Sequence, residues 1–170
     1  MKSDAARIRP AIAADFPAIL ALNAAWVHFL SPLDAARLRL LHAQAAYHRV
    51  AEIDGRVGAF LLAFREGAAY DSPNYLWFAQ RYSEFLYIDR IVVDPEQQGR
   101  GLGARLYDDL FAYAQIAGVA TVTCEFDLDP PNPGSQKFHA RFGFREVGTQ
   151  WLAGGKKQVS LQARAVRTAR

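Results

Sequence analysis

The chain has 170 residues, of which 51% are hydrophobic and 22% are charged, and its formal net charge is +3. This length suits a single domain over residues 1–170 with a substantial core, and so mild a charge argues against an extended nucleic-acid-binding surface. The single cysteine, Cys124, excludes an internal disulfide and a cysteine-based metal site, and we expect no metal. Because no long apolar span or leader-like N-terminus is present, we expect a cytoplasmic protein with no membrane partner.

The N-terminal third is expected to form one strand and two helices. Arg7 to Ala11 has the character of a short strand, and Asp15 stands where a helix cap belongs, with Pro17 in the first turn. Four apolar side chains then fall on one helical face: Phe16, Ile19, Leu22 and Trp26. Ser31 to Asp34 predicts the start of a second helix that runs to about Ala46.

Two strands follow as a hairpin. Tyr47 to Ile53 and Val57 to Phe64 are joined at Asp54-Gly55, which is a strong turn signal. The second strand is apolar on both faces, which places it in the middle of a covered sheet.

The connection from Gly67 to Ser83 is long and rich in aromatic residues. One interpretation is a surface excursion held by tyrosine and tryptophan packing. The other is a lid with aromatic walls that lines a substrate pocket, since long connections in compact domains are usually functional. The lid would present Tyr75, Trp77 and Tyr82.

The strand predicted from Phe85 to Val93 contains two charged residues, Asp89 and Arg90, within an apolar run. A buried charge is costly unless it is paired or used. Asp89 therefore belongs to a structural ion pair or lies at a solvent-facing strand end, or it is a general base that takes a proton from an ammonium group directly or through water. Glu84 is a weaker candidate for the same role.

A glycine-rich loop connects this strand to a helix expected from Leu102 to Gln115, with glycines at 99, 101 and 103. Closely approaching backbone and free N–H groups at a helix N-terminus make such a loop suitable for phosphate. The spacing is one residue too short for the dinucleotide fingerprint, and no Gly-Lys-Ser/Thr triplet of a mononucleotide loop occurs.

The segment from Gln98 to Gly103, Gln-Gly-Arg-Gly-Leu-Gly, resembles the Arg/Gln-x-x-Gly-x-Gly/Ala motif of the GNAT superfamily of N-acetyltransferases. Val93-Asp94-Pro95 before it fits the Val-x-Pro pattern of the same family. Asn132-x-x-Ser135-x-x-Phe138-His139-x-x-x-Gly143-Phe144 resembles a second motif of the family. One position departs from the pattern, because His139 stands where the family usually has the tyrosine that protonates the departing thiolate.

The remaining elements are a strand from Thr121 to Asp127, a short helix from Ser135 to Phe142 and a closing strand from Lys157 to Ala163, with a frayed tail over residues 165–170. The resemblance implies the α/β (α+β) GNAT fold, a mixed and strongly twisted sheet of about six to seven strands flanked by helices.

The resemblance also implies function: transfer of an acetyl group from acetyl-CoA to the amine of a small molecule, amino acid or peptide by direct attack. Asp89 would accept or orient the amine proton. His139 would protonate the leaving thiolate, or Tyr87, a tyrosine of the lid or water would do so in its place. Coenzyme A would contact Ile91, Val92, Val93, Gln98, Gly99, Arg100, Gly101, Leu102, Gly103, Ala104, Asn132, Ser135 and Phe138. The acceptor would meet His28, Phe29, Tyr75, Trp77 and Tyr82.

A second function class stays open. Because His139 replaces the usual tyrosine, the chain could also be an acyl-CoA-binding or regulatory module that does not catalyse the transfer. The basic residues are scattered, so we expect no nucleic-acid partner. A homodimer is common among proteins with this resemblance and is an expectation here.

Overall fold

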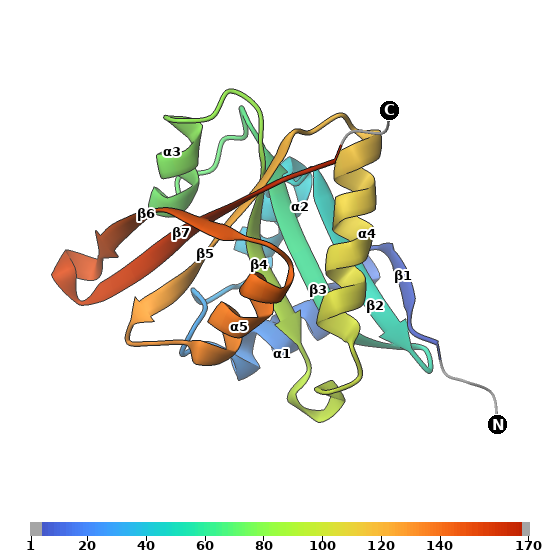
Figure 1. Ribbon diagram of the computed structural model, residues 1–170. Coiled ribbons are helices and arrows are strands. Elements are labelled where there is room, and N and C mark those ends of the chain that lie inside the picture. The colour runs from blue at the N-terminus through green and yellow to red at the C-terminus, as the bar shows by residue number, and fades with distance from the viewer. Residues whose placement is uncertain (1–4, 168–170) are drawn as a thin grey trace. The chain divides into compact units, whose positions relative to one another are not determined.

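The computed structural model describes residues 5–167, which form an α/β fold with seven strands and five α-helices (Figure 1). The strands are β1 (Arg7–Pro10), β2 (Tyr47–Ile53), β3 (Arg56–Arg65), β4 (Leu86–Val93), β5 (Thr121–Asp129), β6 (Arg145–Leu152) and β7 (Lys157–Ala165). The α-helices are α1 (Phe16–Ala25), α2 (Ala35–Gln44), α3 (Pro73–Ala79), α4 (Leu102–Ile116) and α5 (Pro133–Arg141). Three short 3-10 turns are η1 (Ala13–Asp15), η2 (Pro95–Gln97) and η3 (Ala153–Gly155). The chain divides into two units: residues 1–64 with 88–113, and residues 65–87 with 114–170.

In the first unit the strands follow the order β1, β2, β3 and β4. β1 and β3 flank β2 in antiparallel pairing, with Ile8 opposite Ala51 and Val50 opposite Phe60. The hairpin turn predicted at Asp54-Gly55 is confirmed, and both residues have positive φ. As expected for a covered strand, every residue of β3 from Gly58 to Phe64 is buried.

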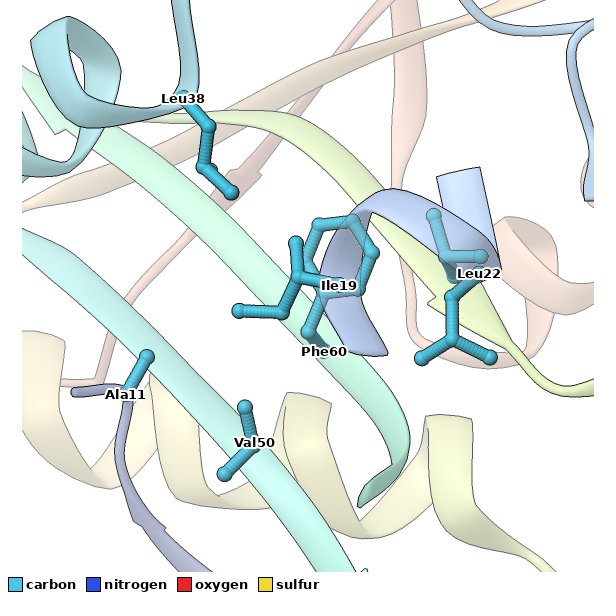
Figure 2. Packing of buried hydrophobic residues seen from close by; sticks show 7 residues of the cluster. Ala11, Ile19, Leu22, Leu38, Val50 and Phe60 are labelled. Carbon is cyan, nitrogen blue, oxygen red and sulfur yellow. The ribbon is translucent and has the colours of Figure 1, made fainter. Parts of the chain in front are cut away.

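Alternation along β2 directs its side chains to helices on opposite faces. The Tyr47 hydroxyl donates to the Asp109 carboxylate of α4 over 2.7 Å, and Arg49 donates to the same carboxylate over 3.0 Å. On the other face, Val50 packs with Ile19 of α1 and Leu38 of α2 (Figure 2). The predicted stripe of α1 is confirmed, since Ile19 and Leu22 are buried in this cluster and Phe16 and Trp26 pack against it.

The second unit holds β5, β7 and β6 in that order, with β7 antiparallel to both neighbours. The first residues of β4 pair with β5 in parallel, Leu86 opposite Val122 and Tyr87 opposite Thr123. Helix α5 packs on β5 through the rings of His139 and Phe126, whose centroids are 5.8 Å apart.

One predicted helix start requires correction, whereas the start predicted at Asp15 is confirmed. The cap of α2 is Asp34, whose Oδ1 accepts from the Arg37 N–H over 2.7 Å, and the helix ends at Gln44. Ser31 lies upstream of the helix. Asp15 occupies the N-cap position of α1, but its carboxylate accepts from Arg9 and from the Ile12 N–H instead of capping the helix. The hydrogen bonds from Arg9 lower the pKa of Asp15 despite its burial.

The aromatic connection is also more regular than expected, because its centre folds as α3. Pro73 stands in the first turn of that helix, where its fixed φ is favourable. Only its flanks, residues 66–72 and 80–85, lack regular structure.

The closing strand is longer than predicted. β7 reaches Ala165, and the Val166 N–H donates to the Ala120 carbonyl over 2.9 Å. These two residues of the expected frayed tail therefore pair with the sheet, while residues 168–170 lie outside the described part of the chain.

Candidate functional site

The loop between β4 and α4 contains two glycines with left-handed backbone conformation. Gly99 has φ of +79° and Gly101 has φ of +74°, values that favour glycine. A Cβ built at either position would meet no atom within 4 Å, so the backbone conformation, not crowding, requires glycine. Helix α4 begins at Leu102, and the N–H groups of its first turn lie at the positive end of the helix dipole. The loop therefore has the elements of an anion site.

The peptide group that opens this loop is held at both of its polar ends. The Trp26 indole Nε1 donates to the Val93 carbonyl over 2.9 Å, and the Asp94 N–H donates to the Gly58 carbonyl over 2.9 Å. From the sequence, Trp26 was predicted only to pack on the apolar face of α1. Its hydrogen bond was missed because no local pattern indicates a bond to a carbonyl 67 residues away. Gly58 was missed as well, although a glycine inside a strand signals close backbone approach.

Gly58 brings β3 close to the loop and to α4. A Cβ at this position would lie 3.3 Å from Leu102 Cδ1 and 3.5 Å from Gln97 Cγ. Gly58 therefore lets the start of α4 pack directly on the strand.

The predicted cofactor residues of the first unit differ in what they expose. Val92 is 2% exposed and its side chain belongs to the core, so only its backbone is suited to ligand contact. Leu102 is buried as well, whereas Ile91, Val93, Gly103 and Ala104 are half-buried and Gln98 to Gly101 are exposed. The Arg100 guanidinium donates to Gln97 Oε1 over 2.6 Å, which holds it beside the loop.

Asp89 lies in a buried ion pair with its neighbour in sequence. Arg90 Nε donates to Asp89 Oδ2 over 2.7 Å, and both side chains are 6% exposed. Arg90 also donates to Asn23 Oδ1 over 2.9 Å and to the Ser31 carbonyl over 3.2 Å. Asp89 thus forms the structural ion pair that was one of its predicted roles. If Asp89 is also the general base, it must accept the proton while it is paired with Arg90.

In the second unit, helix α5 brings together four predicted residues. Asn132 is the N-cap, and its Oδ1 accepts from the Ser135 N–H over 3.3 Å. His139 Nδ1 lies 2.7 Å from the Ser135 carbonyl oxygen and 3.1 Å from Ser135 Oγ. Phe138 is half-buried and contacts the His139 ring edge-on, with centroids 5.5 Å apart.

The environment of His139 determines its chemistry. The residue is 4% exposed, and its ring packs against Phe126 and Phe144. Burial lowers the pKa of His139, opposed only in part by the hydrogen bond to Ser135. Because a carbonyl oxygen can only accept, Nδ1 carries the proton in the neutral ring. A proton-donating role therefore requires the imidazolium form, which burial disfavours.

Tyr87 is fully buried, and its hydroxyl donates to Glu125 Oε2 over 2.8 Å. Next to that glutamate, Cys124 is buried, and burial raises the pKa of its thiol, which fits its role as a small core side chain.

The predicted acceptor residues fall into two groups. His28 and Phe29 lie in the first unit, in the segment after α1, and both are exposed, Phe29 at 41%. In the second unit, Tyr75 is buried, donates to the Arg65 carbonyl over 2.8 Å and accepts from the Ala68 N–H over 3.0 Å. Its ring lies 5.7 Å from that of Tyr87, so Tyr75 supports the segment from within.

Trp77 and Tyr82 are half-buried. The Arg81 guanidinium lies 3.9 Å from the centroid of the Trp77 ring, and the Tyr82 ring lies 6.0 Å from that of Phe78. These two side chains therefore fit the predicted aromatic wall better than Tyr75 does.

Comparison with known proteins identifies the family of this chain. Residues 11–144 match the model of the family described as "Acetyltransferase (GNAT) family". The chain belongs to the GNAT acetyltransferase family. In this GNAT protein no helix within residues 5–167 has both the length and the apolar character needed to cross a membrane. No cluster of three or more His, Cys, Asp or Glu side chains suited to a metal occurs in the same range.

Curated relatives match a shorter stretch of this GNAT chain. A phosphinothricin N-acetyltransferase of Streptomyces coelicolor is 38% identical over 73 residues, which cover 39% of this chain and 37% of that enzyme. An N-acetyltransferase of Streptomyces griseus is 37% identical over 62 residues, 36% of this chain and 31% of the relative. The matched stretch thus spans about a third of the length of these relatives.

Solved structures show the GNAT fold over nearly the full length. The ribosomal-protein-S18-alanine N-acetyltransferase from Escherichia coli superposes with a TM-score of 0.74 at 18% identity, covering 98% of this chain and 97% of that one. Ard1 from Thermoplasma volcanium gives a TM-score of 0.77 at 16% identity, with coverages of 96% and 99%. At these identities the likeness concerns the fold alone.

Proposed function

We propose that the protein is an acetyl-CoA-dependent N-acetyltransferase whose acceptor is the amine of a small molecule, an amino acid or a peptide. The observation that carries the proposal is the loop Gln98 to Ala104, with two left-handed glycines immediately before the N-terminus of α4, in a chain of the GNAT family. Acetyl-CoA supplies the thioester whose acetyl group the acceptor amine attacks.

The residues of the loop and its strand are assigned as follows. The amides of Gln98, Gly99, Arg100, Gly101, Leu102, Gly103 and Ala104 bind the pyrophosphate, since they lie at the positive end of the α4 dipole. The backbone of Ile91, Val92 and Val93 pairs with the pantetheine arm, and the Val93 N–H polarises the thioester carbonyl. Only the N–H of Val93 can donate to the thioester oxygen, because the Val93 carbonyl is an acceptor and is bonded to Trp26 Nε1.

On α5, the amide nitrogen of Asn132 hydrogen-bonds the pantetheine arm, while its Oδ1 caps the helix. Ser135 and Phe138 are assigned to coenzyme A on the second motif of the family. His139 or Tyr87 delivers the proton to the departing thiolate, and Asp89 receives or orients the amine proton. His28, Phe29, Tyr75, Trp77 and Tyr82 are assigned to the acceptor, and the exposed or half-buried members of this set are the ones suited to direct contact.

Calorimetric titration of acetyl-CoA into the wild type and into Gly101→Glu tests the cofactor assignment. The matched control is Gly118→Glu, at the C-terminal end of the same helix. Gly118 has φ of +70°, and a Cβ there also meets nothing within 4 Å, so both variants carry similar backbone strain. We expect binding to be lost only in Gly101→Glu, whose carboxylate enters the anion site. Absence of saturable binding to the wild type would refute the proposal.

A second function has its own support. His139 is buried with Nδ1 on the helix backbone, and Asp89 is paired with Arg90, so both candidate proton carriers are in structural contacts. These contacts suit an acyl-CoA-binding module without turnover. Steady-state release of CoA in the presence of a panel of primary amines separates the two functions, because only an enzyme releases CoA in excess of its own concentration.

A further inference from the structure

The side chain of Trp26, which follows α1, is hydrogen-bonded to a backbone carbonyl of β4. Its Nε1 donates to the Val93 carbonyl over 2.9 Å, at the last residue of the strand. The next residue, Asp94, donates its N–H to Gly58 on β3 over 2.9 Å. Rotation of the Val93–Asp94 peptide plane would break both bonds, so the two contacts together fix its orientation.

The orientation of this peptide is passed on to the glycine loop. Asp94 caps the turn η2, because its Oδ1 accepts from the Glu96 N–H over 2.9 Å. Gln97 N–H donates to the Asp94 carbonyl over 2.8 Å, and Gln97 in turn accepts from Arg100. The direction in which the chain leaves β4 therefore sets where Gln98 to Gly101 lie.

Trp26 is itself held at its backbone. Its N–H donates to the Asn23 carbonyl over 3.1 Å, and its own carbonyl accepts from the N–H groups of Phe29 and Leu30 over 2.9 and 3.1 Å. Its side chain packs against the buried cluster that contains Ile19, Leu22 and Val92. These contacts hold the Trp26 indole in place beside the Val93 carbonyl.

A second anchor fixes the segment that begins at Trp26. Arg90 of β4 donates to Asn23 Oδ1 and to the Ser31 carbonyl, and Asn23 Nδ2 donates to the same carbonyl over 3.1 Å. Residues 26–31 are therefore tied to β4 at both ends, with the exposed residues Val27, His28 and Phe29 between the anchors. This arrangement resists sliding of α1 along the strand.

We propose that Trp26 is a positioning residue of the acetyl-CoA site: its indole N–H sets the Val93–Asp94 peptide and, through Asp94, the glycine loop. The inference rests on the proposed function, because it assigns cofactor binding to that loop. Trp26 is assigned to act through the backbone, by its bond to the Val93 carbonyl, and not on the reacting atoms.

The test is the dissociation constant of acetyl-CoA, measured by calorimetry, for Trp26→Phe. Phenylalanine keeps an aromatic ring at the position and removes the N–H. Loss of one hydrogen bond to a peptide carbonyl predicts a dissociation constant raised about five- to tenfold. The matched control is Trp151→Phe on β6, where the tryptophan is 54% exposed, and we expect it to bind like the wild type.

Melting temperatures separate positioning from support of the fold. A purely structural role lowers the melting temperature of Trp26→Phe but leaves the dissociation constant of its folded form unchanged, and that outcome would overturn the inference. If Trp26→Phe fails to fold, 3-benzothienylalanine at position 26 replaces the N–H by sulfur in a ring of nearly the same shape and keeps the test decisive. Absence of acetyl-CoA binding to the wild type would instead refute the proposed function.

Discussion

Asp89 and Arg90 are neighbours on a strand, yet their charged groups meet at 2.7 Å in a site where both side chains are 6% exposed. Removing one partner of such a pair leaves the other buried without its counter-charge. At the scale of single residues, this pair and His139 decide whether the family's proton transfers can operate here.

The first prediction concerns Asp89→Asn, which keeps the shape and removes the charge. We expect the free energy of unfolding to fall by about 3 kcal/mol, because Arg90 loses its carboxylate. If Asp89 is also the base, kcat of the folded variant falls by about a hundredfold or more. Urea unfolding and steady-state kinetics measure the two effects separately.

Glu84→Gln is the control for Asp89→Asn, since Glu84 is exposed and was the competing candidate. We expect it to change neither quantity. An Asp89→Asn enzyme with lowered stability and unchanged kcat would restrict Asp89 to its structural pair.

The second prediction concerns proton delivery by His139. Burial lowers its pKa below the ordinary value of 6.5, so the protonated fraction grows as the pH falls from 8 towards 6. If the imidazolium protonates the thiolate, the ratio of kcat between wild type and His139→Ala increases as the pH falls. A ratio independent of pH would assign the proton to water or to Tyr87. Trp151→Phe, at an exposed residue outside the assigned site, serves as the control.

At the scale of secondary-structure elements, α2 and β2 meet through two histidines. The Nδ1 atoms of His42 and His48 lie 2.7 Å apart, which requires one shared proton, and His48 is buried against Phe60. Burial, together with the nearby charge of His42, lowers the pKa of His48 to about 4, while Asp15 acts in the opposite direction.

The third prediction follows from that shift. The unfolded chain binds a proton at His48 near pH 6.5 and the folded chain only near pH 4, so stability falls as the pH decreases between these values. The loss is on the order of 3 kcal/mol. Urea unfolding from pH 7.5 to 4.5 measures it, and His48→Leu is expected to flatten the profile. Because burial also lowers the pKa of His139, some dependence of the same sign persists in that variant.

The fourth prediction concerns the contact between α3 and β6. A Cβ at Gly148 would lie 2.5 Å from Cζ2 of Trp77, whose ring is stacked on Arg81. Gly148→Ala therefore forces a rigid indole to move, and we expect a loss of about 1–3 kcal/mol of stability. The double variant Trp77→Leu/Gly148→Ala should lose less than the sum of the single variants. Strict additivity would show that the ring moves freely.

At the scale of the whole molecule, β4 is the element that both units share, because Leu86 and Tyr87 belong to one unit and residues 88–93 to the other. A strand does not readily unfold over half its length while the other half stays paired. This continuity supports the expectation of one domain over residues 1–170.

The fifth prediction is a single calorimetric unfolding transition, with calorimetric and van't Hoff enthalpies equal. Acetyl-CoA at a hundred times its dissociation constant should stabilise the protein by about 2.7 kcal/mol and raise the melting temperature by roughly 5–10 °C. Two transitions of which only one shifts would contradict the single domain. Gly118→Glu should retain the shift, and Gly101→Glu should lose it.

Much of this protein is legible in its sequence, because the signals are local. Apolar alternation located β5, the 3.6-residue period located α4, and Asp54-Gly55 located the hairpin of β2 and β3. Glycine spacing and the order of two motifs predicted the family, which the match over residues 11–144 shows. These features depend on neighbours a few residues apart, and backbone geometry relates them directly to structure.

Some predictions from the sequence were wrong or incomplete, because a side chain found a hydrogen-bond partner that the local pattern did not indicate. Asp34 capped α2 in place of Ser31, and Arg9 drew the Asp15 carboxylate away from the cap of α1. The centre of the aromatic connection folded as α3, and the Tyr75 hydroxyl on that helix bonds to two backbone groups of its own unit.

By itself, then, the sequence determined the fold class, the family and the position of the glycine loop. Only the tertiary structure decided that Asp89 is paired with Arg90, that His139 bonds to its own helix and that Trp26 holds the carbonyl of Val93. The physical reason is that protonation and hydrogen bonding depend on burial and on which polar atoms approach within about 3 Å, and folding alone brings residues 26 and 93 to that distance.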